Sequence, residues 1–423
     1  MRKRLITPPN ELISALLRTP FRPEFFTLNG VRIPYMRLEV PFPVEDLFEW
    51  LSAQNLFPKV YFETELDGAI AAIGSVFQTN EIPTFSEETG PRLFGGRDFM
   101  KRRKNSWKSF PDCSYFLPLI EIEKRKEGTF LCINRTEENL DFTLEPPLPL
   151  EGSFSPISRF DSPSYPVWER EIGDILKGIN RNEYLKVVLA RCTKLEGEGH
   201  CSPYALLKNL SGNHRFAFQF SEKEAFISST PEMLYRRVGD HVQCAAIAGT
   251  SPRGSTPEKD AFFKDQLLNC PKERHELDVV KDMIVKTLSP LCLSVSISEC
   301  TTLQTTYVHH LHHLIEGTLQ PGVTDHMLVD ALHPTPAVGG FPKVETCREI
   351  NKREHFDRGW YAAPIGFVSP EKAHHMVAIR SALVEENTLR LYAGTGIVKG
   401  STPIREWEEL EHKISQYMAF YEK

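Results

Sequence analysis

The spacing of apolar positions along the chain predicts a change of architecture near residue 165. Before it, short apolar runs such as 60–63 and 116–122 are separated by proline and glycine, as is typical of strands joined by turns. From Trp168 to Asn180, apolar residues recur every three or four positions, which predicts a helix with one buried face. The proline-rich stretch at about 146–166 is expected to connect the two regions.

Beyond residue 180, predicted strands and helices are interspersed without strict alternation. Strands are expected at 185–189, 216–220, 225–228, 233–238 and within 363–398. Helices are expected at 257–288, 324–332, 343–354 and 403–421, the first after a capping Thr256. Strands in hairpin-like succession, with helices inserted among them, predict an α+β fold with largely antiparallel sheets.

Composition narrows the class of protein. The 423 residues are 41% hydrophobic and 25% charged, which is typical of a globular protein with a large core. A net charge of -6 offers nucleic acid no general attraction, and the one basic run, 101–104, is interpreted as a solvated loop.

No apolar stretch reaches the roughly 18 residues that span a bilayer. Residues 1–17 lack the unbroken apolar core of a signal peptide. Nine cysteines without CxxC pairs fit reduced thiols, so we expect a cytoplasmic protein.

Two predicted helices carry acidic residues at helical spacing. Glu406, Glu409 and Lys413 are three and then four residues apart and share one face of the last helix. Glu273 and Glu276 are one turn apart on the long helix. Carboxylates from separate helices suit Mg²⁺, with water and substrate oxygens completing an octahedron. A solvated salt-bridge ladder explains the same spacing, so both interpretations stay open.

Two glycine-containing segments could approach an anion. Gly394 and Gly396 follow a predicted strand, but no helix follows them, which argues against a dinucleotide fingerprint. Their backbone N–H groups could bind an anion, or they could form a simple turn. Segment 248–254, with Thr250 and Arg253, makes a similar turn.

Lys186 and four histidines are further candidates for functional residues. Lys186 lies among apolar neighbours at the start of a predicted strand, where a lysine that reaches solvent is the simpler interpretation. The histidines invite a zinc hypothesis, yet neither a cysteine pattern nor HExxH accompanies them, which disfavours it. They stand at 309, 310, 312 and 313.

These segments, in this order, resemble the chorismate-utilising enzymes, the family of isochorismate, salicylate, anthranilate and aminodeoxychorismate synthases. The resemblance covers residues 165–423. It rests on KVVLAR (186–191), STPEML (229–234), AGTSPRG (248–254), KERHELDVV (272–280), RGWYAAPIGF (358–367), AIRSALV (378–384), YAGTGIV (392–398) and EWEELEHK (406–413).

The resemblance implies roles for individual positions. Lys186 resembles the base that activates water, and Glu232 the acid that protonates the departing hydroxyl. Glu276 and Glu409 resemble the magnesium ligands, with Glu273 and Glu406 as additional or water-mediated ligands. The residues that resemble the family's chorismate-binding groups are Gly249, Thr250, His333, Tyr361, Arg380, Gly394, Gly396 and Lys413.

The resemblance also narrows the reaction. Family members that use ammonia have Gln in place of Lys186 and need an amidotransferase partner, so Lys186 implies water as the nucleophile and no such subunit. Isochorismate synthase and salicylate synthase, which goes on to eliminate pyruvate, then remain. Segment 331–343, ALHPTPAVGGFPK, resembles the isochorismate synthase version. Ala363 and Leu410 depart from the usual Gly and Thr of the family.

The expected architecture is therefore two stacked, largely antiparallel sheets flanked by helices, as in anthranilate synthase component I. Residues 1–160 are expected to be a divergent N-terminal part of the same structural unit, and residues 161–423 the chorismate-binding catalytic region. The expected activity is magnesium-dependent conversion of chorismate to isochorismate. The non-enzymatic alternative is a binding module of the same fold with an inactive site.

Overall fold

The computed structural model describes residues 20–102, 106–136, 142–212, 214–304 and 308–421. The segment considered as a signal peptide and residues 103 and 104 of the basic run lie outside these ranges. Arg102 is described, and its guanidinium donates to Asp98 Oδ1 at 2.7 Å and to the carbonyl oxygen of Phe110 at 2.7 Å. This part of the basic run is therefore bound to the protein, contrary to its interpretation as a solvated loop.

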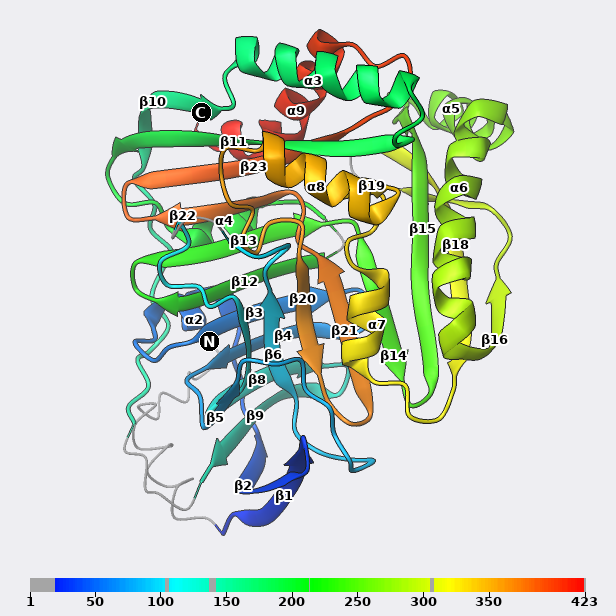
Figure 1. Ribbon diagram of the computed structural model, residues 1–423. Coiled ribbons are helices and arrows are strands. Elements are labelled where there is room, and N and C mark those ends of the chain that lie inside the picture. Colours follow the sequence, from blue (N-terminus) through cyan, green and yellow to red (C-terminus); the bar gives the residue numbers. More distant parts are fainter. Residues whose placement is uncertain (1–19, 103–105, 137–141, 213, 305–307, 422–423) are drawn as a thin grey trace.

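Two antiparallel sheets form the body of the described chain (Figure 1). Sheet A has the order β1-β2-β9-β8-β4-β3-β12-β13-β22-β23-β11-β10, with β19 also paired to β11. Its strands are β1 (Arg22–Leu28), β2 (Val31–Pro41), β9 (Gly128–Arg135), β8 (Ile120–Arg125), β4 (Gly68–Ile73), β3 (Lys59–Thr64), β12 (His214–Ser221), β13 (Glu224–Thr230), β22 (Ser381–Glu385), β23 (Thr388–Ile397), β11 (Lys186–Glu198), β10 (Ser155–Ser162) and β19 (Gly340–Phe341).

Sheet B has the order β16-β18-β15-β14-β21-β20-β6-β7-β5, with β17 also paired to β18. In Figure 1 its strands run across the direction of the sheet A strands. They are β16 (Cys292–Ile297), β18 (Val308–Leu319), β15 (His241–Pro252), β14 (Met233–Val238), β21 (Lys372–Val377), β20 (Pro364–Val368), β6 (Leu93–Arg97), β7 (Cys113–Leu117), β5 (Phe77–Thr79) and β17 (Thr301–Gln304).

The N-terminal third contributes strands to both sheets. In sheet A, β3 pairs with β12, so that Phe62 lies opposite Phe216. In sheet B, β6 pairs with β20, so that Phe94 lies opposite Phe367. The core is continuous across these junctions, because the Phe62 and Phe367 rings meet edge to face at 5.5 Å between the sheets. Two stacked antiparallel sheets with flanking helices confirm the predicted α+β class.

The helices cover the ends and sides of the sheets (Figure 1). Among the described residues they are α2 (Leu47–Ala53), α3 (Tyr165–Asn180), α4 (Pro203–Asn209), α5 (Pro257–Asn269), α6 (Pro271–Leu288), α7 (Asp325–Leu332), α8 (Lys343–Arg353) and α9 (Pro403–Met418). The apolar positions of α3 at Ile172, Ile175 and Ile179 are buried, as their spacing predicted.

Two predicted elements are each divided by a proline. The helix expected over 257–288 is two helices, because Pro271 disfavours helical torsion angles at the residue before it, and Cys270 has φ -77° and ψ 112°. The single run expected at 116–122 is divided between β7 and β8, with Pro118 in the connection. The prediction of single elements was wrong at both places.

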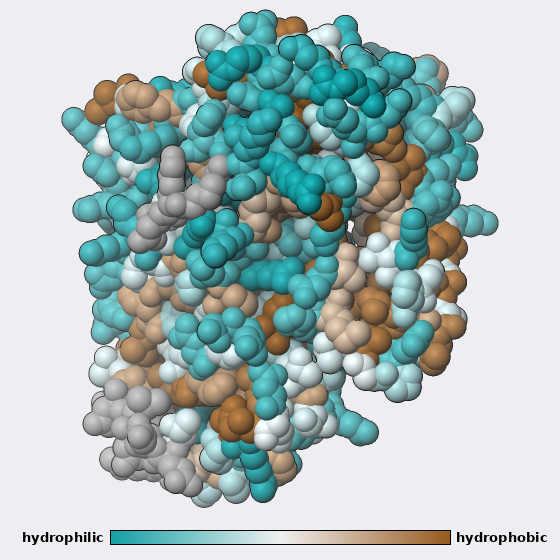
Figure 2. Space-filling model, in the orientation of Figure 1, coloured by the Kyte–Doolittle hydropathy of each residue, from teal (hydrophilic) through white to brown (hydrophobic). Residues whose placement is uncertain are grey.

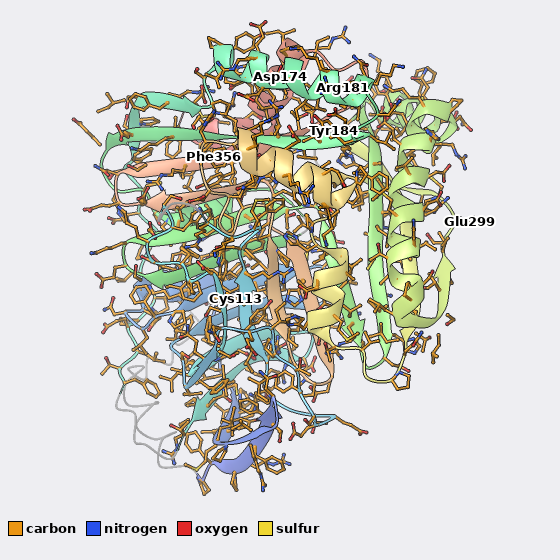
Figure 3. All side chains as sticks on the ribbon, in the orientation of Figure 1. Cys113, Asp174, Arg181, Tyr184, Glu299 and Phe356 are labelled. Atoms are coloured by element: carbon orange, nitrogen blue, oxygen red, sulfur yellow. The ribbon has the colours of Figure 1, made fainter. Side chains whose placement is uncertain are left out.

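The interior is packed with aromatic side chains, and the surface is mixed. Trp107, Trp168 and Trp360 are fully buried, and side chains fill the spaces between the ribbons (Figure 3). Hydrophilic residues dominate the upper part of the face in Figure 2, over α3. Within the described ranges, every helix is too short or too polar to cross a bilayer.

Candidate active site

Lys186 begins β11, and the pairing of β11 with β23 sets its surroundings. Val188 lies opposite Gly396, and Ala190 lies opposite Gly394. Because side chains alternate along a strand, Lys186 projects on the same face of sheet A as these two glycines. Gly394 and Gly396 therefore lie within strand β23, which excludes the simple turn that was one of the two alternatives left open by the sequence.

Both glycines make room for other residues on this face. A Cβ atom at Gly396 would lie 2.4 Å from Lys186 Cε, and one at Gly394 would lie 2.8 Å from Tyr361 Oη. Real Cβ atoms do not approach other atoms so closely. The absence of two side chains on β23 thus allows the lysine and the tyrosine to share one space.

A buried ion pair fixes the backbone of β11 near Lys186. Glu354, which follows α8, accepts from Ala190 N at 2.8 Å. Arg358 donates to Glu354 Oε1 at 2.6 Å and to the Val188 carbonyl at 2.9 Å. Sequence reasoning missed both residues; their i, i+4 spacing beside the RGWYAA segment was the available signal.

The charged groups that affect the pKa of Lys186 are other residues predicted to belong to the site. Burial is the main cause that lowers the pKa of its ammonium, and the neighbouring positive charge of Lys413 lowers it further. The carboxylates of Glu232, Glu276 and Glu409 act in the opposite direction. One space is therefore bordered by residues from β11, α6, α9 and the start of β14. A lysine with a lowered pKa is suited to accept a proton.

Glu232 immediately precedes β14 and has the opposite perturbation. Burial raises the pKa of its carboxyl to about 6, although a hydrogen bond from Thr335 and the charges of Lys186 and Lys413 oppose the rise. Its backbone carbonyl accepts from Val377 N at 3.0 Å, which fixes it to the end of β21. A carboxyl whose pKa is raised toward neutral pH is better suited to donate a proton than an ordinary glutamate.

Positive and polar groups line the same space. Arg380 has φ +51°, and its carbonyl accepts from Ser229 N at 3.2 Å and Tyr417 Oη at 2.8 Å. Neither the Arg380 guanidinium nor the Tyr361 hydroxyl makes a hydrogen bond to another residue in the described ranges. Lys413 Nζ donates to the Gly394 carbonyl at 2.8 Å. The Arg380 guanidinium and the Tyr361 hydroxyl can therefore hold an anion without first giving up a hydrogen bond within the described protein.

The four carboxylates predicted as metal ligands come from two helices. Glu409 accepts from Lys413 Nζ at 2.5 Å, and Glu406 accepts from the Thr395 hydroxyl at 2.5 Å. Across the space, Glu273 on α6 accepts from Thr250 N at 3.2 Å. Gly249, at a bulge of β15 with φ +66°, leaves room for the Glu273 side chain.

This donor set fits a hard cation. Within the described ranges, His, Cys, Asp and Glu side chains form no group of three or more that could hold a metal ion. Magnesium does not require such a group, because it is commonly bound by one or two carboxylates together with water and substrate oxygens. The charges of Glu276 on α6 and Glu409 on α9 both raise the pKa of Lys186, so both helices lie within electrostatic range of this lysine.

A family model described as "Chorismate binding enzyme" matches residues 64–420. The chain belongs to the chorismate-binding enzymes. The match covers most of the chain and begins within β3, so the family includes much of the N-terminal third as well as the region that carries the resemblance.

Individual relatives of this family agree with the assignment. The isochorismate synthase MenF of Pasteurella multocida is 31% identical over 87% of this chain and 88% of its own. The structure of MenF, the menaquinone-specific isochorismate synthase from Escherichia coli, matches with a TM-score of 0.86 and 25% identity, over 98% of this chain and 99% of its own. Anthranilate synthase component I from Streptococcus pneumoniae has the same fold, with a TM-score of 0.66 and 19% identity, over 93% of this chain and 89% of its own.

His333 lies differently from the other residues that the family resemblance suggested. It is buried, its Nε2 is 3.1 Å from the Phe99 carbonyl, and its ring packs edge to face on Phe99. Burial lowers the pKa of His333 to about 3, so it is neutral. Another residue of this segment, Thr335, contacts the site, because its hydroxyl donates to Glu232 Oε1 at 3.1 Å. Sequence reasoning did not single it out.

The four histidines of β18 have separate partners. His309 Nε2 is 2.9 Å from Asp260 Oδ1, His310 Nδ1 is 3.2 Å from the Gly249 carbonyl, and His313 Nδ1 is 2.8 Å from the Ser298 carbonyl. His312 Nδ1 is 3.5 Å from the Thr301 hydroxyl. His310 and His312 share one face of the strand, and the separate contacts of the four rings speak against a shared metal.

The two departures from the family pattern are both buried. Ala363 is fully buried and its N–H donates to the Trp360 carbonyl at 3.3 Å. Leu410 is fully buried on α9, which turns it away from the exposed side of that helix. Both substitutions therefore add apolar contact in the interior.

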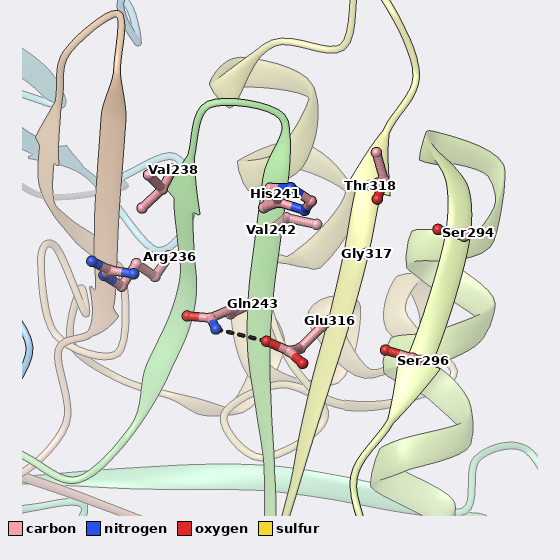
Figure 4. A pocket seen from close by; sticks show the side chains of 10 residues that line it. All are labelled: Arg236, Val238, His241, Val242, Gln243, Ser294, Ser296, Glu316, Gly317 and Thr318. Atoms are coloured by element: carbon pink, nitrogen blue, oxygen red, sulfur yellow. Dashed lines mark hydrogen bonds between the residues drawn. The ribbon is translucent and has the colours of Figure 1, made fainter.

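A surface pocket of about 400 Å³ lies on sheet B and shares no residue with this site (Figure 4). It is lined by polar and apolar residues of β14, β15, β16 and β18, and the Gln243 amide donates to Glu316 at 2.8 Å across it. The residues predicted to carry the family chemistry lie elsewhere, on or beside β11, β14, α6 and α9.

Proposed function

We propose that this chorismate-binding enzyme is an isochorismate synthase that uses Lys186 as base and Glu232 as acid. The observation that carries the proposal is the pair of opposite perturbations in one space: the pKa of Lys186 is lowered and that of Glu232 is raised to about 6. The relatives named isochorismate synthase support the choice of reaction.

The proton transfers balance within the chain and substrate. Neutral Lys186 takes a proton from water as the water oxygen bonds to C2 of chorismate, and the ring double bonds shift. The C4–O bond breaks, and Glu232 gives its proton to the departing hydroxyl, which leaves as water. The product is an isomer of the substrate, and the proton gained by Lys186 returns to Glu232 through solvent before the next turnover.

Substrate binding is proposed to use the positive and backbone groups of the same space. Arg380, Tyr361 and Lys413 would hold the chorismate carboxylates, with backbone groups at Gly249, Thr250, Gly394 and Gly396 beside them. Glu276 and Glu409 would hold Mg²⁺, with Glu273 and Glu406 as further or water-mediated ligands. Bound Mg²⁺ would neutralise carboxylate charge and orient the substrate.

The partners and location follow from the same chemistry. Water needs no amidotransferase subunit, and the net charge of -6 gives no reason to expect nucleic acid. The nine cysteines are all unpaired, which supports a cytoplasmic location. The product is proposed to supply menaquinone, siderophore or salicylate synthesis.

Chromatography of the products from chorismate, with and without Mg²⁺, tests the proposal. We expect isochorismate alone, formed only with the metal. Salicylate plus pyruvate would identify a salicylate synthase instead. No turnover in either condition would favour a binding module with an inactive site.

The variant Lys186→Gln tests the base directly. We expect the rate of isochorismate formation to fall by about 10²- to 10⁴-fold, because general base catalysis contributes this much. The control is Lys177→Gln on the exposed face of α3, which should keep the parental rate, since its ammonium contacts only Asp174 at 2.8 Å among the described residues. Near-normal turnover by Lys186→Gln would contradict the assignment.

A further inference from the structure

One short segment contacts both the proposed acid and the strand of the proposed base. After α7, residues 333–341 lead to β19, which pairs with β11 (Figure 1). Near its start, the Thr335 hydroxyl donates to Glu232 Oε1 at 3.1 Å. At its end, Gly340 pairs with Val187 and Phe341 pairs with Lys186.

Backbone hydrogen bonds hold Thr335 in place. Its carbonyl accepts from Val338 N at 3.1 Å and from Gly339 N at 2.8 Å, which closes a tight turn. The Gly339 carbonyl in turn accepts from Val188 N at 3.1 Å. On the other side, Lys343 Nζ donates to the carbonyl oxygens of Asp330 and His333. The Thr335 hydroxyl is thus presented to Glu232 from an anchored turn.

The hydrogen bond distinguishes the two oxygens of Glu232. A protonated carboxyl has one oxygen that carries the proton and one that only accepts. Since Oε1 accepts from Thr335, the proton is favoured on Oε2. Among the residues the structure describes, none makes a hydrogen bond to Oε2, so that oxygen is available to a ligand.

We propose that Thr335 is a positioning residue, which holds Oε1 of Glu232 and thereby directs the acidic proton on Oε2 toward the departing hydroxyl of the substrate. This inference rests on the proposed function, because it assigns Glu232 as the acid. Thr335 acts through Glu232 and does not itself transfer the proton.

The hydroxyl also affects how readily Glu232 ionises. Three causes lower the pKa of Glu232 against the effect of burial: the Thr335 hydrogen bond, Lys186 on β11 and Lys413 on α9. The Tyr361 hydroxyl adds no charge near this carboxyl, because burial raises its pKa and keeps it neutral. Removing the Thr335 hydroxyl leaves both lysines in place, so the pKa of Glu232 should rise.

The experiment compares Thr335→Val with Thr335→Ser in the full-length enzyme, assayed for isochorismate over a range of pH with Mg²⁺. For Thr335→Val we expect kcat to fall at least about tenfold, as part of the contribution of the general acid. KM should change little, because Thr335 is not proposed to bind the substrate. The inflection of kcat/KM near pH 6 should move up by about one unit, which is the effect of one hydrogen bond to a carboxylate.

Rescue and controls separate this role from a structural one. Thr335→Ser keeps the hydroxyl and should restore kcat and the inflection to near parental values. Thr318→Val, at the surface pocket of Figure 4, should leave both unchanged. If Thr335→Val lacks a cooperative thermal transition, Thr335→Ala serves in its place, because it removes the hydroxyl without adding volume.

The possible failures are distinguishable. A parental enzyme that does not form isochorismate overturns the proposed function and this role with it. An active parental enzyme whose Thr335→Val variant keeps both kcat and the inflection overturns the positioning role alone. A loss of kcat that Thr335→Ser does not rescue, with an unmoved inflection, also overturns it.

Discussion

The two sides of the site differ in how firmly the protein holds them. Lys186 and Glu232 lie at the ends of strands in the stacked sheets, where the Glu354–Arg358 ion pair is almost completely buried, with side chains 4% and 2% exposed. Glu273 and Glu276 lie on α6, where only Leu277, Ile284 and Leu288 are buried. The proposed acid and base are therefore held at the edge of the core, whereas one pair of proposed metal carboxylates stands on a helix with few buried residues.

This difference has a physical advantage for the proposed reaction. Proton transfer requires donor and acceptor to be placed to within fractions of an ångström, which a packed sheet provides. A magnesium ion that keeps several waters tolerates more adjustment of its protein ligands and takes part of its coordination from the substrate. The proposed proton-transfer groups thus lie at the ends of packed strands, whereas the proposed metal ligands that can adjust their position lie on helix α6.

The largest expected effect is a loss of stability when a buried ion pair is broken. An exposed ion pair of the same length serves as the comparison. The Glu354–Arg358 and Asp278–Lys281 pairs are both 2.6 Å, but Asp278 on α6 is 49% exposed. Glu354→Gln leaves a buried arginine charge uncompensated and should lower the free energy of unfolding by about 3–5 kcal/mol. Asp278→Asn should lower it by about 0–1 kcal/mol. Urea unfolding measures both, and similar losses would contradict the contrast between the two regions.

The next largest effect is a fall in kcat, caused by a single methyl group added beside Lys186. Gly396→Ala places a Cβ atom 2.4 Å from Lys186 Cε, so the lysine must move. We expect kcat to fall about 100-fold, as for a misplacement of about 1 Å. The matched control is Gly173→Ala in α3, where a Cβ atom would meet nothing within 4 Å. It should stabilise the helix by about 0.5–1 kcal/mol without changing kcat. Equal kcat values for the two variants would show that Gly396 does not set the position of Lys186.

The smallest expected effect is on metal binding at the exposed helix. Glu276→Gln and Glu409→Gln should each raise the Mg²⁺ concentration for half-maximal activity by about tenfold, because each removes a charged oxygen ligand. Glu299→Gln, at the exposed outer edge beyond α6 (Figure 3), removes the same charge away from the site and should not alter the titration. A titration unchanged in Glu276→Gln would exclude that residue as a ligand.

The periodic parts of the fold could be predicted from the sequence. The buried face of α3 and the strands after residue 180 follow directly from apolar spacing, because one face of each packs on the core. The break at Cys270 was missed because helical periodicity continues on both sides of Pro271, although that proline already carried the signal. The junction of β3 with β12 could not be predicted, since pairing between distant strands leaves no local pattern.

The site could be predicted only where residue chemistry is unusual or the family pattern is specific. The spacing of Glu273, Glu276, Glu406 and Glu409 was ambiguous, and the family resemblance decided its interpretation. Thr335 and Arg358 act through hydrogen bonds to residues about 100 and 170 positions away, which the sequence alone does not pair. His333 is the opposite case: the family segment suggested it as a substrate-binding residue, but its ring is buried against Phe99.

The contacts of segment 333–341 restrict which mutations this enzyme can accept during evolution. Thr335 at one end and Gly340 at the other tie the proposed acid and the strand of the proposed base to one stretch of backbone, so an insertion or deletion between them would shift one against the other. Substitutions that keep the length leave this spacing intact. We therefore expect the segment to tolerate changes in composition at positions that face away from the site, and to be among the least tolerant of changes in length.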